Sequence, residues 1–132
     1  MSAALRRRVE SEVDVRHVVL ETTQFARQAG FDEARSMMIA TTVSELARNI
    51  LKYAHAGEIC VRRVDGPTGP GIEIVAADQG PGIADPESAI SDHYSSGGTL
   101  GLGLPGVKRM MDDFSLQSEP GQGTRVTVTK WI

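Results

Sequence analysis

Asp78-Gln79-Gly80-Pro81-Gly82 opens the part of the chain that decides its fold, and a second glycine-rich run follows as Gly97-Gly98-Thr99-Leu100-Gly101-Leu102-Gly103-Leu104-Pro105-Gly106. Each glycine weakens a helix or strand by about 0.5–1 kcal/mol relative to alanine, so dense glycine indicates positive φ angles or close approach to a ligand. A helical pattern follows the second run, and the N–H groups and positive dipole at a helix start suit phosphate. Either run alone would indicate a surface loop, whereas the two together predict a nucleotide pocket.

Length and composition limit the protein that could carry such a pocket. The chain has 132 residues, a net charge of −3 and one cysteine. This length predicts one domain over residues 1–132. The short basic run at 6–8 is followed by acidic residues, which argues against a nucleic-acid partner. No apolar run approaches the roughly 20 residues that cross a bilayer, so no membrane partner is expected. Cys60, in an apolar stretch, predicts a buried thiol in a reducing, cytoplasmic setting.

The order of expected elements predicts the fold class. Turn-forming residues separate the segments, and Asp32 is placed to cap the second helix, with Gly57 placed to stop it. The expected elements are a strand at 5–13, helices at 15–28 and 32–54, strands at 58–64 and 72–78, a helix at 104–113, and a hairpin at 114–118 and 124–131. Helices and strands alternate in groups, which predicts an α/β fold, a two-layer sandwich of helices on a mixed β-sheet.

The second expected helix carries a polar stripe that includes Glu45, Asn49 and Lys52. Such a stripe usually marks only a solvated face. Asparagine, however, is a poor residue for the middle of a helix, and Glu45 and Asn49 lie four residues apart on one side. A carboxylate there can orient a nucleophile, and an amide oxygen can hold Mg²⁺, which prefers oxygen ligands.

Asp78 ends an expected strand in phase with the apolar residues Ile72, Ile74 and Ala76. The carboxylate is therefore expected on the apolar face, at the end of the strand. Burying it without hydrogen-bond donors is costly, and the exocyclic amine of adenine is a suitable donor. A simple turn aspartate before Gly80 is the alternative explanation.

Four segments resemble, in family order, the motifs of the GHKL (Bergerat-fold) ATPases and kinases. Residues 45–53 (ELARNILKY) resemble the N box, 78–82 (DQGPG) the first glycine box, 101–104 (GLGL) the second and 121–124 (GQGT) the last. Within this family, the short chain and residues 103–114 (GLPGVKRMMDDF) are most similar to the RsbT-type serine/threonine switch kinases of bacterial stressosomes. The chain departs from the family at Thr99, where many relatives carry a glycine.

The resemblance implies a role for each matching residue. Glu45 would be the general base, and Asn49 would ligate Mg²⁺. Asp78 would bind the adenine of ATP, with Gly82 and Thr124 beside the base. The residues expected to bind the nucleotide and its magnesium ion are Asn49, Lys52, Asp78, Gly80, Gly82, Gly98, Gly101, Leu102, Gly103 and Thr124. Residues 84–99 would form a lid.

The resemblance also implies partners and a reaction. The protein would phosphorylate a serine of a STAS-domain stressosome protein and, once released, activate a PP2C-type phosphatase. His17, His55 and His93 lack the context of a phospho-accepting histidine. Two alternatives stay open: an anti-sigma factor of the same fold, and a nucleotide-responsive binding module with negligible turnover. The glutamate at position 45 argues against the binding module, which has no need of a carboxylate beside the phosphates.

Overall fold

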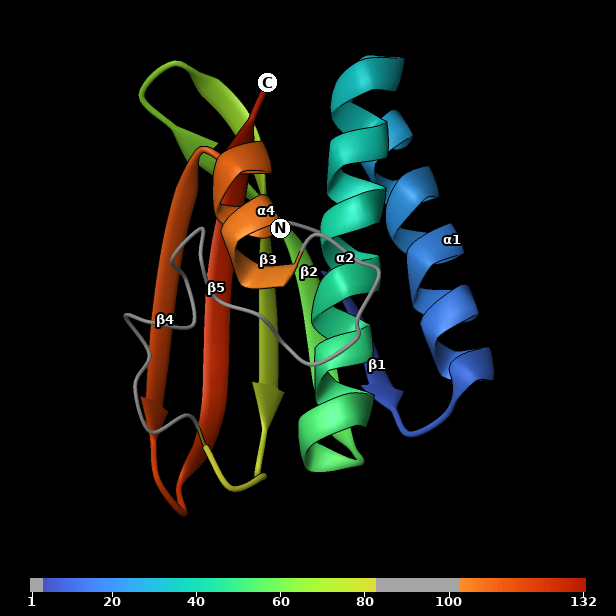
Figure 1. The fold of residues 1–132 in the computed structure, drawn as a ribbon. Coiled ribbons are helices and arrows are strands. Elements are labelled where there is room, and N and C mark those ends of the chain that lie inside the picture. The colour runs from blue at the N-terminus through green and yellow to red at the C-terminus, as the bar shows by residue number, and fades with distance from the viewer. Residues whose placement is uncertain (1–3, 83–102) are drawn as a thin grey trace.

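The computed structural model describes residues 4–82 and 103–132, which form two layers. In Figure 1 the helices α1 and α2 lie together beside one face of a sheet, and α4 lies on the same face. The described elements are β1 (Ala4–Val9), α1 (Glu12–Gln28), α2 (Glu33–Ala54), β2 (Gly57–Gly66), β3 (Gly69–Asp78), α4 (Gly103–Met110), β4 (Asp113–Glu119) and β5 (Gly123–Trp131). The expected two-layer α/β sandwich is confirmed.

The expected mixed sheet is wrong, because the four described strand pairs are all antiparallel. The strand order is β1-β2-β3-β5-β4. The connection from β3 through α4 does return the chain in the same direction on β4. However, β5 lies between these two strands and pairs with both, so they never become neighbours. An alternation of helices and strands cannot reveal such an inserted strand.

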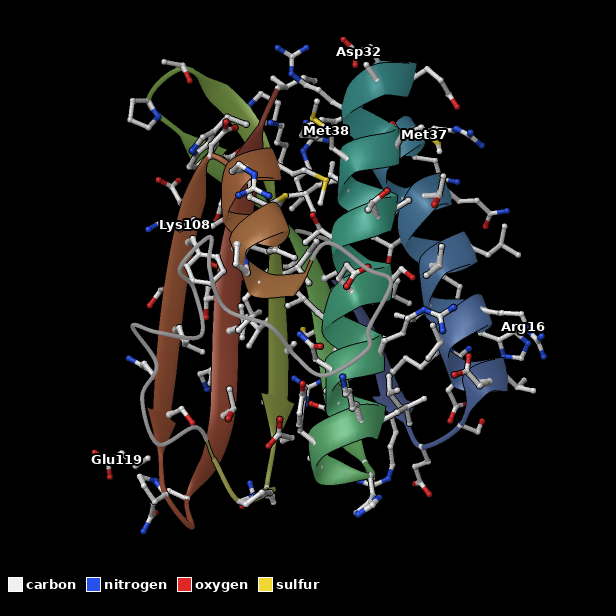
Figure 2. The ribbon with its side chains drawn as sticks, viewed as in Figure 1. Arg16, Asp32, Met37, Met38, Lys108 and Glu119 are labelled. Atoms are coloured by element: carbon white, nitrogen blue, oxygen red, sulfur yellow. The ribbon has the colours of Figure 1, made fainter. Side chains whose placement is uncertain are left out.

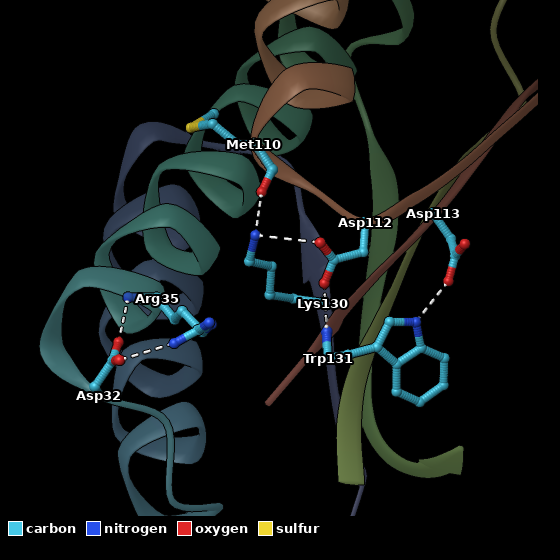
Figure 3. A network of polar contacts seen from close by, with 7 residues as sticks. All are labelled: Asp32, Arg35, Met110, Asp112, Asp113, Lys130 and Trp131. Atoms are coloured by element: carbon cyan, nitrogen blue, oxygen red, sulfur yellow. Dashed lines mark hydrogen bonds and ion pairs between the residues drawn. The ribbon is translucent and has the colours of Figure 1, made fainter. Parts of the chain in front are cut away.

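The helix ends follow capping rules. The side chain of Asp32 accepts a hydrogen bond from the Arg35 amide at 2.8 Å and pairs with the Arg35 guanidinium at 2.9 Å (Figure 3). The predicted cap of α2 is therefore confirmed. The predicted end of α2 at residue 54 is confirmed, but Gly57 does not stop the helix: His55 caps it with a φ of 68°, and Gly57 already belongs to β2. A Cβ at Gly57 would lie 2.6 Å from the Ala77 carbonyl oxygen, so the close approach of β2 and β3 requires glycine there.

One apolar core lies between the helices and the sheet. Its fully buried side chains come from both layers, among them Val18 of α1, Val43 of α2 and Ile74 of β3. Cys60 alternates with the buried residues Ile59 and Val61, so it points to the opposite face of the sheet and is only partly buried. The expected buried thiol is therefore wrong.

The C-terminal end of α4 is anchored to β5. The Lys130 ammonium donates to the Met110 carbonyl at 2.8 Å and lies 3.5 Å from the Asp112 carboxylate (Figure 3). The Trp131 amide and indole donate to Asp112 and Asp113, each at 2.8 Å. A cation at the last carbonyls of a helix also complements its dipole. These contacts fix the direction in which the short helix presents its other end.

Candidate functional site

Asp78 is the last residue of β3. The residues that precede it on the same face of this strand, Ile72, Ile74 and Ala76, are fully or nearly fully buried. The predicted phase of this strand is confirmed. One carboxylate oxygen, Oδ1, accepts hydrogen bonds from the amides of Gly80 at 2.9 Å and Thr124 at 3.2 Å. Within 4–82 and 103–132, no group donates to the other oxygen. Asp78 is thus held in place through one oxygen and can accept a donor of a ligand through the other.

Glycines let three segments pack closely together around the end of β3. A Cβ at Gly123, where φ is +87°, would collide with the carbonyl oxygen of Asp78 itself. A Cβ at Gly82, where φ is +80°, would collide with the Glu119 carbonyl, and one at Gly80 would lie 2.6 Å from the Ala54 side chain. The Gly121 amide donates to the Pro81 carbonyl at 2.7 Å. The first glycine motif is therefore packed against both α2 and the β4–β5 turn.

A cavity of about 650 Å³ lies at this end of the sheet, lined by residues of the β3, β4 and β5 ends that include Asp78, Ser118 and Thr124. Figure 2 labels Glu119, which also lines the cavity, at the end of the molecule opposite to Asp32. The C-terminal end of α2 lies at the same end as the cavity (Figure 1). The polar residues of α2 therefore extend toward the Asp78 region.

Glu45 is the buried member of the polar stripe on α2, with an exposed fraction of 9%. Its Oε2 accepts a hydrogen bond from the Gly103 amide at 3.3 Å. Gly103 has a φ of +65° and begins α4, one residue before the expected start. The helix ends at Met110, earlier than the expected boundary at 113. The carboxylate therefore lies against the positive end of α4, where an anion is stabilised.

The other polar residues of α2 diverge. Asn49 is half-buried, and its side-chain amide makes no hydrogen bond within the described part of the chain. Lys52 is exposed and its ammonium lies 5.2 Å from the centre of the Tyr53 ring. Arg48 turns toward α1, where its guanidinium pairs with Glu12 at 3.3 Å. Glu45, Asn49 and Lys52 become more exposed, in that order, toward the end of α2.

The described residues fit the expected ligands. The Asp78 oxygen left for a donor, beside a cavity that Asp78 and Thr124 line, suits the amine of a base. Among residues 4–82 and 103–132, no cluster of three or more histidine, cysteine or acidic side chains could hold a metal ion. A magnesium ion held by one amide, phosphates and water needs no such cluster. Among the same residues, no helix is long and apolar enough to cross a membrane.

Several expected site residues lie outside the described ranges. They are Gly98, Gly101 and Leu102, together with the expected lid at 84–99 and His93. The structure does describe one residue that sequence reasoning missed. Ser118 hydrogen-bonds the Thr124 hydroxyl at 2.8 Å and the Gly123 carbonyl at 3.1 Å. The pairing of the two hairpin strands could have revealed Ser118, since it lies directly opposite Thr124.

Comparison with known proteins agrees with this fold. A model of the histidine kinase-like ATPase domain matches residues 9–130. The chain is 47% identical over 107 residues to the serine/threonine-protein kinase RsbT of Bacillus subtilis, covering 81% of this chain and 80% of the relative. It is 31% identical over 98 residues to an anti-sigma F factor of a Thermoanaerobacter species, covering 71% of this chain and 68% of that protein.

Two solved structures have similar folds. A structure of RsbU and RsbW domains from Mycobacterium tuberculosis aligns with a TM-score of 0.68 at 16% identity, over 97% of this chain and 32% of that chain. The SiaB–SiaC complex from Pseudomonas aeruginosa aligns with a TM-score of 0.59 at 13% identity, over 98% of this chain and 89% of that chain. At these identities the likeness concerns the fold alone.

Proposed function

The chain belongs to the histidine kinase-like ATPase family, and from this membership we propose that it is an ATP-dependent protein serine/threonine kinase that works by exchanging partners. The contact between the buried Glu45 carboxylate and the start of α4 carries the proposal. It brings a proton acceptor next to amides that suit a phosphate. The 47% identity to RsbT supports the same reaction.

Phosphoryl transfer needs positioning and charge neutralisation more than covalent chemistry. In the proposed reaction, Asp78 accepts a hydrogen bond from the adenine amine, with Gly80, Gly82 and Thr124 around the base. The amides of Gly98, Gly101 and Leu102 would hold phosphate oxygens, the Gly103 amide would exchange its contact with Glu45 for a phosphate oxygen, and Lys52 would add a positive charge. Asn49 would hold Mg²⁺, which when bound neutralises phosphate charge.

The proposed step is a displacement of ADP at the terminal phosphorus of ATP. The serine hydroxyl oxygen forms a bond to the terminal phosphorus of ATP, the bond to ADP breaks, and Glu45 takes the hydroxyl proton. The added phosphate carries about −1.5 to −2 charge. Close to the Glu45 carboxylate, that charge favours release of the product. The freed kinase surface is then available to a second partner.

The proposed substrate is a serine of a STAS-domain protein, and the proposed second partner is a PP2C-type phosphatase. Both follow from the resemblance of residues 103–114 to RsbT-type kinases. An anti-sigma factor is the second candidate function, favoured by the 31% identity to an anti-sigma F factor. The nucleotide pocket would be the same, so the two functions differ in the protein that is bound.

A phosphotransfer assay tests the proposal. The purified chain would be incubated with labelled ATP, Mg²⁺ and a candidate STAS protein, with Glu45→Gln as the inactive control. We expect label on a serine of the STAS protein, stable to acid, and none on the kinase itself. Co-purification before and after ATP addition should show that the phosphorylated partner is released.

Two results would contradict the proposal. If the STAS protein stayed bound after complete phosphorylation, partner exchange would be wrong. If a sigma factor bound tightly while no STAS protein accepted phosphate, the anti-sigma function would replace the kinase function.

A further inference from the structure

Three polar side chains form a row across the sheet where its apolar face ends. Asp78 of β3 lies opposite Thr124 of β5, and Thr124 lies opposite Ser118 of β4. The preceding row on the same face is apolar, formed by Ala76, Val126 and Leu116. Neighbouring side chains in such a row lie close enough to interact directly. All three polar residues line the cavity at the end of the sheet.

The described contacts of this row give its hydroxyl protons one direction. A carbonyl oxygen can only accept, so the 3.1 Å contact between the Ser118 hydroxyl and the Gly123 carbonyl uses the single proton of Ser118. The 2.8 Å contact between the two hydroxyls must then use the proton of Thr124. The chain of donors runs from Thr124 to Ser118 to Gly123. A remaining lone pair on the Ser118 oxygen can accept a further hydrogen bond without altering this order.

The Thr124 hydroxyl is consequently left with lone pairs only for a ligand. The Thr124 amide donates to Asp78 Oδ1, so the neighbouring carboxylate is held in the same row. The carboxylate of Asp78 also offers only acceptors. Within the described row, Asp78 and Thr124 thus present acceptors to the cavity from two adjacent strands.

We propose that Ser118 is a positioning residue that orients the Thr124 hydroxyl as an acceptor and thereby makes the base pocket select a 6-amino purine over a 6-oxo purine. This inference rests on the proposed nucleotide-binding function. A 6-oxo group would face acceptors, whereas an amine donates to them. Without Ser118, the Thr124 hydroxyl is free to rotate and donate its proton to an oxygen of the base.

The test compares the affinities of ATP and ITP by calorimetry in the full chain. ITP replaces the 6-amino group by an oxygen and adds a proton on the adjacent ring nitrogen, and this difference is the same for every variant. We expect Ser118→Ala to reduce the preference for ATP over ITP by about two- to tenfold, the factor that one neutral hydrogen bond contributes. Ser118→Thr retains a hydroxyl and should keep the wild-type preference.

Ser115→Ala is the matched control. Ser115 lies on the same strand, is exposed, and points to the opposite face of the sheet. It should leave the preference unchanged. If Ser118→Ala fails to fold by circular dichroism, Ser118→Cys provides the same test with a thiol that hydrogen-bonds weakly.

The possible outcomes separate the two proposals. A preference in Ser118→Ala within the error of wild type, or a change of equal size in Ser118→Thr, would overturn the positioning role. Wild-type protein that binds neither ATP nor ITP would instead overturn the proposed function.

Discussion

The Glu45 carboxylate of α2 accepts a hydrogen bond from the Gly103 amide at the start of α4, although 58 residues separate them. The candidate base and a candidate phosphate-binding amide are therefore direct neighbours. In this position the carboxylate can do two separate things: it accepts a hydrogen bond from the start of α4, and it can take a proton as a base. Substitutions can be chosen that remove one property and keep the other.

Glu45→Gln keeps an oxygen that accepts from Gly103 but cannot take a proton at neutral pH. We expect ATP affinity and thermal stability close to wild type, with phosphotransfer reduced by about 10²–10⁴-fold, the usual contribution of a general base. Glu45→Ala should lose the same activity and also the contact to α4. Rate assays with a phosphorylated partner as product, together with calorimetry, provide the measurements. Transfer at the wild-type rate by Glu45→Gln would rule out the assigned base.

Gly121 and Gly123 form a matched pair for testing the close approach at the base pocket. Both have positive φ, at +78° and +87°, but a Cβ at Gly121 would meet nothing within 4 Å while one at Gly123 would collide with the Asp78 carbonyl. Gly121→Ala should cost only the backbone strain, about 1–2 kcal/mol of the free energy of unfolding. Gly123→Ala should cost about a further 1–3 kcal/mol, because the strands must separate.

Urea denaturation of the two variants measures this difference in the free energy of unfolding. ATP affinity should fall only in Gly123→Ala, because only this substitution distorts the pocket. Equal destabilisation by both substitutions would mean that φ alone, and not the contact with Asp78, requires glycine at position 123.

Local patterns in the sequence predict much of this structure. The cap at Asp32 and the phase of Asp78 are both as expected, because each depends on a spacing within one element. Gly82 has a positive φ, one of the two alternatives that the dense glycines indicated. The roles assigned to the site residues stay predictions, since their side chains can be located without a ligand but their chemistry cannot be tested that way.

Pairings between distant elements are less accessible to sequence reasoning. In the observed strand order, β5 lies between β3 and β4. This order depends on how the whole sheet buries its apolar face, and not on any local pattern. His55 ends α2 in a conformation for which glycine is the usual residue, so no composition rule indicates it. The Ser118–Thr124 contact needs the register of a hairpin whose turn residues fit several alignments.

An ion pair between β1 and α1 makes stability depend on pH. The Arg7 guanidinium donates to both carboxylate oxygens of Glu21, at 2.6 and 3.1 Å, and this lowers the pKa of the Glu21 carboxyl below its ordinary value of 4.5, against the opposing effect of burial. A lowered pKa in the folded state stabilises the protein above pH 4.5, and this stabilisation is lost as the pH falls through the folded pKa.

Glu21→Gln should remove this pH dependence. Stability at pH 7 should fall by less than about 1 kcal/mol, because 36% of the Glu21 side chain is exposed and solvent screens the pair. Below pH 4.5 the variant should lose stability less steeply than wild type, as measured by urea midpoints from pH 3 to 7. Glu33→Gln, which breaks a more exposed pair with Arg27, is the control. Parallel curves for wild type and Glu21→Gln would show that the pair contributes nothing.

Asp78→Asn tests the adenine assignment directly. The amide oxygen of asparagine can still accept from Gly80 and Thr124, so the fold of the pocket should persist. The other position then carries an NH₂ group, which faces the adenine amine donor to donor. Losing a charge-assisted hydrogen bond costs about 1.5–3 kcal/mol, so ATP affinity should fall by roughly ten- to a hundredfold.

Asp78→Asn should also reduce the difference in affinity between ATP and the 6-oxo nucleotides, since an NH₂ group can donate to the 6-oxo group of ITP or GTP. Calorimetry with ATP and GTP on wild type and variant gives the comparison. Wild-type protein that binds the two nucleotides equally would refute the adenine assignment. A variant that loses affinity for both by the same factor would indicate that Asp78 supports the loop at Gly80 rather than reading the base.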